Sequence, residues 1–114
     1  MIFDKLKEEL LQSLRSFFPA AKVDIKERRG VILELRAYLD EATFIEVYAN
    51  AMTGKRSFAL ISKGERITGY DNYRFWHYHP PDNPDDHIPS LEPTIDLILS
   101  SFKDLLVRSS GLRA

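Results

Sequence analysis

The sequence predicts a single α+β domain, residues 1–114, in which two terminal helices pack on a five-stranded antiparallel meander sheet. Two observations carry this prediction. Apolar residues recur at helical spacing near each end of the chain, and between the ends they alternate with polar residues in short runs. The connections between these runs are also short, which favours hairpins over long crossovers.

The N-terminal segment has the pattern of an amphipathic helix over residues 2–18. Its charged side chains fall between apolar side chains that recur every three or four residues, at Phe3, Leu6, Leu10, Leu14 and Phe17. Pro19 is expected to end this helix, because proline disfavours the helical conformation in the residue before it.

The middle of the chain has the alternation of strands. The run from Val31 to Leu39 alternates apolar and polar residues, and the run TFIEVYAN is rich in β-branched and aromatic residues. Four short connections separate the runs, which predicts that each strand pairs with the next. The five expected strands are 22–26, 31–39, 43–50, 57–62 and 66–70.

The last third of the chain combines an irregular segment with a second helix. Prolines and aspartates fill residues 80–89, which argues against a helix or a central strand there. A helix is expected over residues 91–107, with Ser90 as its N-cap and Gly111 ending it. Its apolar face would cover the sheet through Leu91, Ile95, Ile98, Phe102 and Leu105.

Composition and charge exclude several classes of protein. The chain has no cysteine, so disulfide scaffolds and cysteine-ligated zinc sites are excluded. A net charge of −1 argues against binding nucleic acid by bulk charge alone. Residues 55–74 nevertheless carry five basic and two acidic residues, whereas residues 80–96 carry five acidic residues and no Lys or Arg. With neither a signal peptide nor a membrane span in its sequence, the protein is expected to be cytoplasmic, without a membrane partner.

Polar and aromatic chemistry is concentrated in residues 70–89, which hold the only Trp and all three His. If residues 73–79 are extended, the side chains of His77 and His79 point to one face. Two imidazoles on one strand face suit general acid–base catalysis, and they also suit a divalent metal whose ligand set Asp71 or His87 could complete. The structural alternative is that this aromatic-rich segment only packs.

An ordered set of short motifs gives the chain a family resemblance over residues 33–106. The motifs are FIEVYAN at 44–50, TGKRSFALI at 53–61, GERI at 64–67, YDN at 70–72, WHYHP at 76–80 and HIP at 87–89. In their order and spacing they resemble the TumE family, the toxin-like components of small toxin–antitoxin operons. The resemblance implies a helix-turn-helix antitoxin as partner and an action on RNA. The matching positions in its most recognisable motif are Asp71, Asn72, Trp76, His77, His79 and His87.

The leading hypothesis is a ribonuclease-like toxin that needs neither a metal nor another cofactor. His77 and His79 would share the base and acid roles, with Asp71 as the third catalytic residue. The expected substrate-binding residues are Arg66, Arg74, Asn72, Trp76 and His87. Of the two arginines, either could stabilise the charge that develops on the phosphate.

Two alternatives remain open from the sequence. One is a non-catalytic module whose sheet edge and aromatic strand bind an antitoxin or a second copy of the chain as a homodimer. The other is a metal-dependent hydrolase that uses His77 and His79 together with Asp71 or His87.

Overall fold

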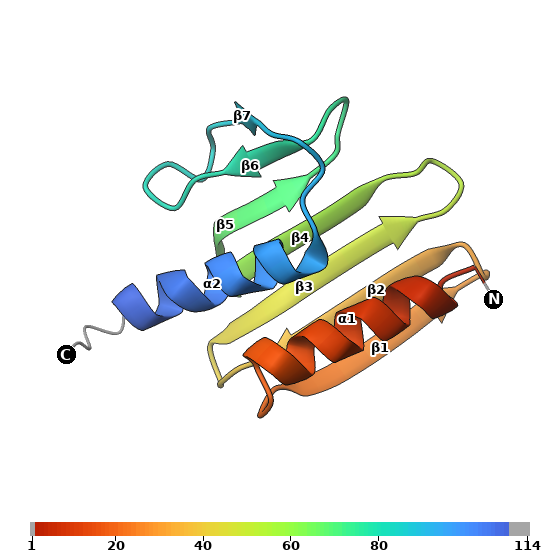
Figure 1. Ribbon diagram of the computed structural model, residues 1–114, viewed down its shortest axis with the longest axis horizontal. Coiled ribbons are helices and arrows are strands. Elements are labelled where there is room, and N and C mark those ends of the chain that lie inside the picture. The colour runs from red at the N-terminus through yellow and green to blue at the C-terminus, as the bar shows by residue number, and fades with distance from the viewer. Residues whose placement is uncertain (1, 110–114) are drawn as a thin grey trace.

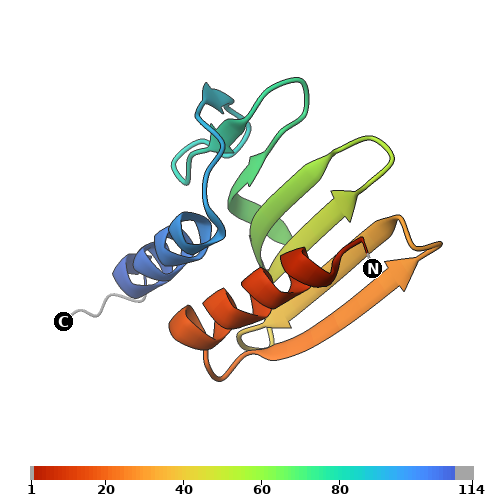
Figure 2. The ribbon, with the colours of Figure 1, turned by 45° about the vertical axis from the view of Figure 1, so that its right-hand side comes forward.

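The computed structural model describes residues 2–109 and has the expected α+β architecture. One antiparallel sheet forms one layer, and the two helices lie side by side on one of its faces (Figure 1). In the turned view, both helices again lie on the same side of the sheet (Figure 2). Neither helix among the described residues is long and apolar enough to cross a membrane.

The sheet is the predicted meander, but it has seven strands where five were expected. Each strand pairs antiparallel with the next along the chain. The two additional strands form a short hairpin, one just before the Pro/Asp-rich segment and one at its end, and at three and two residues they are too short to produce an alternating pattern. The elements are α1 (Asp4–Phe17), β1 (Lys22–Arg28), β2 (Ile32–Tyr38), β3 (Thr43–Asn50), β4 (Arg56–Ser62), β5 (Glu65–Asp71), β6 (His77–His79), β7 (Ile88–Pro89) and α2 (Ile95–Ser109).

The core lies between the helices and the face of the sheet that they cover. Alternate residues of the central strands β2 and β3 point toward the helices, which is why the apolar period of two predicted them correctly. Leu10 of α1 and Phe102 of α2 are both fully buried against this face. The fully buried strand residues are Leu33, Leu35, Ala37, Ile45 and Leu60.

The second helix begins four residues later than expected. It starts at Ile95, and its N-terminal hydroxyl is that of Thr94, which accepts a hydrogen bond from the Leu97 N–H at 3.1 Å. The prediction that Ser90 caps this helix was wrong. Pro93 explains the delay, because it disfavours a helical conformation at the residue before it. The predicted stop at Gly111 lies outside the described residues.

No helix among residues 2–109 covers the opposite face of the sheet, and we call this face the open face. The pairing register places a row of side chains across it, from Tyr48 on β3 through Ser57 and Asp71 to His77 on β6. Gly69, two residues before Asp71 on β5, lies against β4 so closely that a Cβ atom there would meet the Phe58 carbonyl oxygen at 2.7 Å. The sheet therefore brings the polar centre of the sequence onto its open face.

Candidate functional site

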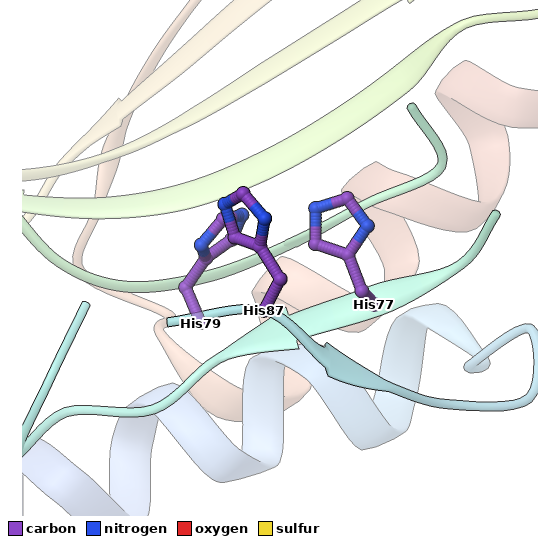
Figure 3. A group of neighbouring side chains, drawn as sticks. All are labelled: His77, His79 and His87. Atoms are coloured by element: carbon purple, nitrogen blue, oxygen red, sulfur yellow. The ribbon is translucent and has the colours of Figure 1, made fainter. Parts of the chain in front are cut away.

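Three imidazoles meet on the open face at the end of the meander. His77 and His79 are two residues apart on β6, so both side chains point to the same side of the strand, as expected from the sequence (Figure 3). The condition under which this was expected, an extended segment over 73–79, is met only in part. Only residues 77–79 form a strand, and Arg74 has a positive φ of 68° in the preceding turn.

Asp71, the last residue of β5, joins the two histidines. Its Oδ1 atom lies 3.0 Å from His77 Nε2, and its Oδ2 atom lies 2.8 Å from His79 Nε2. The register explains this bridge, since Asp71 pairs directly with His77 and Gly69 pairs with His79. The His77 and His79 side chains are only 4% and 3% exposed. The centre is therefore buried almost as completely as the apolar core.

The remaining ring nitrogens of the pair contact backbone carbonyls. His77 Nδ1 lies 2.9 Å from the Phe75 oxygen, and His79 Nδ1 lies 3.0 Å from the Pro84 oxygen. A carbonyl oxygen only accepts hydrogen bonds, so both Nδ1 atoms carry their hydrogen and donate it. This fixes the orientation of both rings and aims both Nε2 atoms at Asp71.

His87 brings the third imidazole to the centre. Pro89 pairs with His77 and Ile88 pairs with Tyr78, so continuing this register by one residue places His87 opposite His79. The centroid of its ring lies 4.8 Å from that of His77 and 4.9 Å from that of His79. Unlike the buried pair, His87 is exposed, which makes it the member of the cluster that meets solvent.

The Asp71 carboxyl group has a lowered pKa. Burial alone would raise this pKa, but the Tyr73 N–H, together with the hydrogen bond from His79 and the charges that His77 and His79 carry when they are protonated, outweighs it. The Tyr73 N–H lies 3.0 Å from Asp71 Oδ1. Asp71 is therefore an ionised carboxylate at neutral pH, and it can act only as an acceptor or as a ligand.

A loop, residues 80–87, covers the buried pair. Its Pro84 carbonyl oxygen accepts hydrogen bonds from His79 Nδ1 and from the Arg66 guanidinium, each at 3.0 Å. Two turns give the loop its shape, through the Asn83 N–H on the Pro80 oxygen and the Asp86 N–H on the Asn83 oxygen. Arg66, expected from sequence to bind substrate, thus holds the loop in place.

Of the other predicted substrate-binding residues, His87 joins the imidazoles, and the remaining three make contacts of their own. Asn72 uses its side-chain amide on the backbone, accepting from the Arg56 N–H at 2.7 Å and donating to the Gly54 oxygen at 2.8 Å. Trp76 packs against the apolar core. The Arg74 guanidinium lies 5.4 Å from the centroid of the Tyr73 ring. Asp71, His77, His79 and His87 therefore form the candidate site.

Sequence reasoning missed the contribution of the backbone. The carbonyls of Phe75 and Pro84 orient the two imidazoles, and a carbonyl leaves no signal in residue type. The pairing of His87 with His79 depends on a hairpin register that the short β6 and β7 do not reveal. The sequence analysis predicted the shared face of His77 and His79 and named Asp71 and His87 as candidates to join them, but it contained no signal for these contacts.

Comparison with known proteins found no matching family model, no matching curated protein and no matching solved structure.

Proposed function

We propose that this protein is the toxin-like component of a toxin–antitoxin pair and that it cleaves RNA at the centre formed by Asp71, His77, His79 and His87. The observation that carries the proposal is the meeting of three imidazoles, two of them buried and bridged by the Asp71 carboxylate and the third exposed to solvent. Imidazoles are the side chains best suited to proton transfer near neutral pH. The toxin part of the proposal rests on the resemblance of residues 33–106 to the TumE family.

Basic and aromatic side chains next to the centre support RNA as the substrate. Lys55 Nζ lies 5.9 Å from the ring centroid of Tyr48 and 6.0 Å from that of Tyr73. Tyr48 lies in the same row of paired residues across the sheet as Asp71, with Ser57 between them. Tyr73 is two residues after Asp71 in the sequence. Unpaired bases stack on aromatic rings while cations contact phosphates, so this surface fits a single strand.

The chemistry we propose is attack of a ribose 2′-hydroxyl on the adjacent phosphate. A base removes the 2′ proton as the O2′–P bond forms, and an acid protonates O5′ as the P–O5′ bond breaks. The products are a 2′,3′-cyclic phosphate and a 5′-hydroxyl. His87 is exposed and takes one of these roles, while His77 or His79 takes the other after its Nε2 atom leaves Asp71. Arg74 stabilises the charge on the phosphate.

A binding function is the second candidate, and exposed apolar side chains near the centre favour it. Tyr73 is 59% exposed, Phe75 50% and Ile88 44%. Exposed apolar groups that lie together are typical of surfaces that bind proteins. An antitoxin docked on Tyr73 and Phe75 would lie beside the centre, because the Phe75 ring centroid is 5.3 Å from that of His77, and it would block access to the imidazoles, so the two functions are compatible.

Cleavage of a labelled single-stranded RNA by the purified protein tests the proposal. The His87→Ala variant should lose activity by at least about 100-fold, the low end of what acid–base catalysis contributes. Asp24→Asn, at an exposed aspartate of β1, is the matched surface control and should remain active. RNA left intact by folded wild-type protein, across RNAs of varied sequence, would overturn the proposal.

A further inference from the structure

The proton positions at the buried pair are in conflict unless a cation lies between the groups. Both Nδ1 atoms donate to carbonyls, so in a neutral imidazole each Nε2 atom carries a lone pair. These two lone pairs face the two oxygens of a single carboxylate at 3.0 and 2.8 Å. Lone pairs on both sides of such a contact repel each other.

Protons resolve the conflict only at a cost. A proton on each Nε2 atom would create two imidazolium ions, with ring centroids 4.9 Å apart, in side chains that are 3–4% exposed. A single carboxylate would then balance two buried positive charges, with a third imidazole beside them. A proton on Asp71 would satisfy only one of the two nitrogens.

We propose that the centre binds a divalent transition-metal ion through Asp71, His77 Nε2, His79 Nε2 and His87, with zinc as the simplest candidate. One ion placed between the two Nε2 atoms and the carboxylate would accept a lone pair from each of these groups, and this removes the repulsion between them. A set of imidazole nitrogens and one carboxylate is typical of zinc and its first-row neighbours. This inference goes beyond the proposed function, because metal binding requires no activity on RNA.

The distances fit the ion. Ligand atoms bonded to zinc at about 2.0–2.1 Å lie roughly 3 to 3.4 Å apart when they are neighbours. Of the two nitrogen–oxygen distances, 3.0 Å lies at the lower limit of this range and 2.8 Å lies just below it, so both groups need to separate only slightly to take the ion between them. One ligand nitrogen from each of the three histidines lies within 4.8 Å of the other two, so a small movement of the exposed His87 completes the set.

The surroundings of the buried pair are those of metal ligands. A histidine ligand usually donates its second ring N–H to a carbonyl or carboxylate, which fixes its tautomer and orientation. Here Phe75 and Pro84 supply a carbonyl to each ring. Arg66 binds the same Pro84 oxygen, and this links loop 80–87 to β5. The buried pair is thus held ready to bind an ion.

Titration of metal-free, untagged protein with Zn²⁺, followed by calorimetry, tests the inference, and Co²⁺ supplies a visible spectrum. We expect one ion per chain, with the absorption bands of a low-symmetry site. His87→Ala removes an exposed ligand without disturbing the core, and it should weaken binding by at least about 100-fold, the upper end of what outer partners of a site cost. Asp71→Asn should weaken it similarly.

Asp82→Asn, an exposed aspartate in the same loop, is the matched control and should bind as the wild type does. No saturable binding by folded wild-type protein, or equal binding by wild type and His87→Ala, would overturn the inference. Cleavage of RNA by metal-free protein in the presence of a chelator would leave the proposed function standing without the ion. If a chelator abolishes cleavage, the acid–base roles of the histidines pass to water on the ion.

Discussion

The apolar core on the covered face and the histidine pair on the open face are equally well buried, but by different means. On the covered face Ile45 is 0% exposed, and on the open face His79 is 2% exposed. Two helices of 14 and 15 residues cover the first face and contribute an apolar surface to it. Loop 80–87 covers the imidazoles and is held largely by polar contacts to the Pro84 oxygen.

This difference separates the apolar burial that stabilises the fold from the polar burial that shapes the site. Apolar burial under the helices contributes free energy to folding in proportion to the area removed from water. Burial of the imidazoles contributes little free energy to folding, because each hydrogen bond that an imidazole made with water must be replaced by one within the protein. A loop held by a few hydrogen bonds can open at small cost and admit a substrate to His77 and His79.

The largest effect is expected at the covered face. Phe102→Ala removes a fully buried ring of α2 and should lower the free energy of unfolding by about 3–5 kcal/mol. Leu97→Ala, at a half-exposed position on the same helix, should cost far less. Chemical denaturation measures both variants. Equal destabilisation by the two changes would show that α2 is not packed on the sheet by this face.

An intermediate effect is expected at Asn72, which joins the two ends of the β4–β5 hairpin. Asn72→Ala removes hydrogen bonds to the Arg56 N–H and the Gly54 oxygen and should cost about 1–2 kcal/mol. Because the amide is engaged by the backbone, RNA cleavage per folded molecule should be unchanged. A variant of normal stability that has lost RNA binding would instead restore the substrate-binding role expected from sequence.

The smallest effect on stability is expected at the loop. Arg66→Ala removes one of the two donors to the Pro84 oxygen and should cost about 1 kcal/mol or less. Its main consequence should be local, with faster hydrogen exchange at the Asn83 and Asp86 amides while exchange in β3 is unchanged. Lys63→Ala, an exposed residue in the β4–β5 turn, is the control. Unchanged exchange in the loop would mean that other contacts hold it closed.

The same distinction explains what could be predicted from the sequence. The helices, the first five strands and the meander followed from periodicity, because the covered face imposes one apolar residue every two or every 3.6 positions. The shared face of His77 and His79 followed from the same rule. The turn at Arg74, the β6–β7 hairpin and the contacts of Phe75 and Pro84 did not, since they depend on backbone groups and register that residue types do not encode.

The late start of α2 is another feature that periodicity did not predict. Ser90 and Thr94 are both acceptable N-caps, and both lie near a proline. Pro93 decides which of them caps the helix, because it disfavours a helical conformation at the residue before it. The helix therefore starts after Pro93, although the apolar Leu91 fits the helical pattern. Leu91 is accordingly 91% exposed in the structure.

The central claim is that the imidazole cluster acts on RNA, and growth under tight inducible expression tests it most directly. Wild type, His87→Ala and the His77→Ala/His79→Ala double variant are compared without antitoxin, and total RNA is examined in the same cultures. The account predicts growth arrest with RNA cleavage for the wild type, and neither effect for folded His87→Ala. Arrest that is equally strong in His87→Ala, or normal growth with intact RNA in cells that accumulate folded wild-type protein, would contradict it.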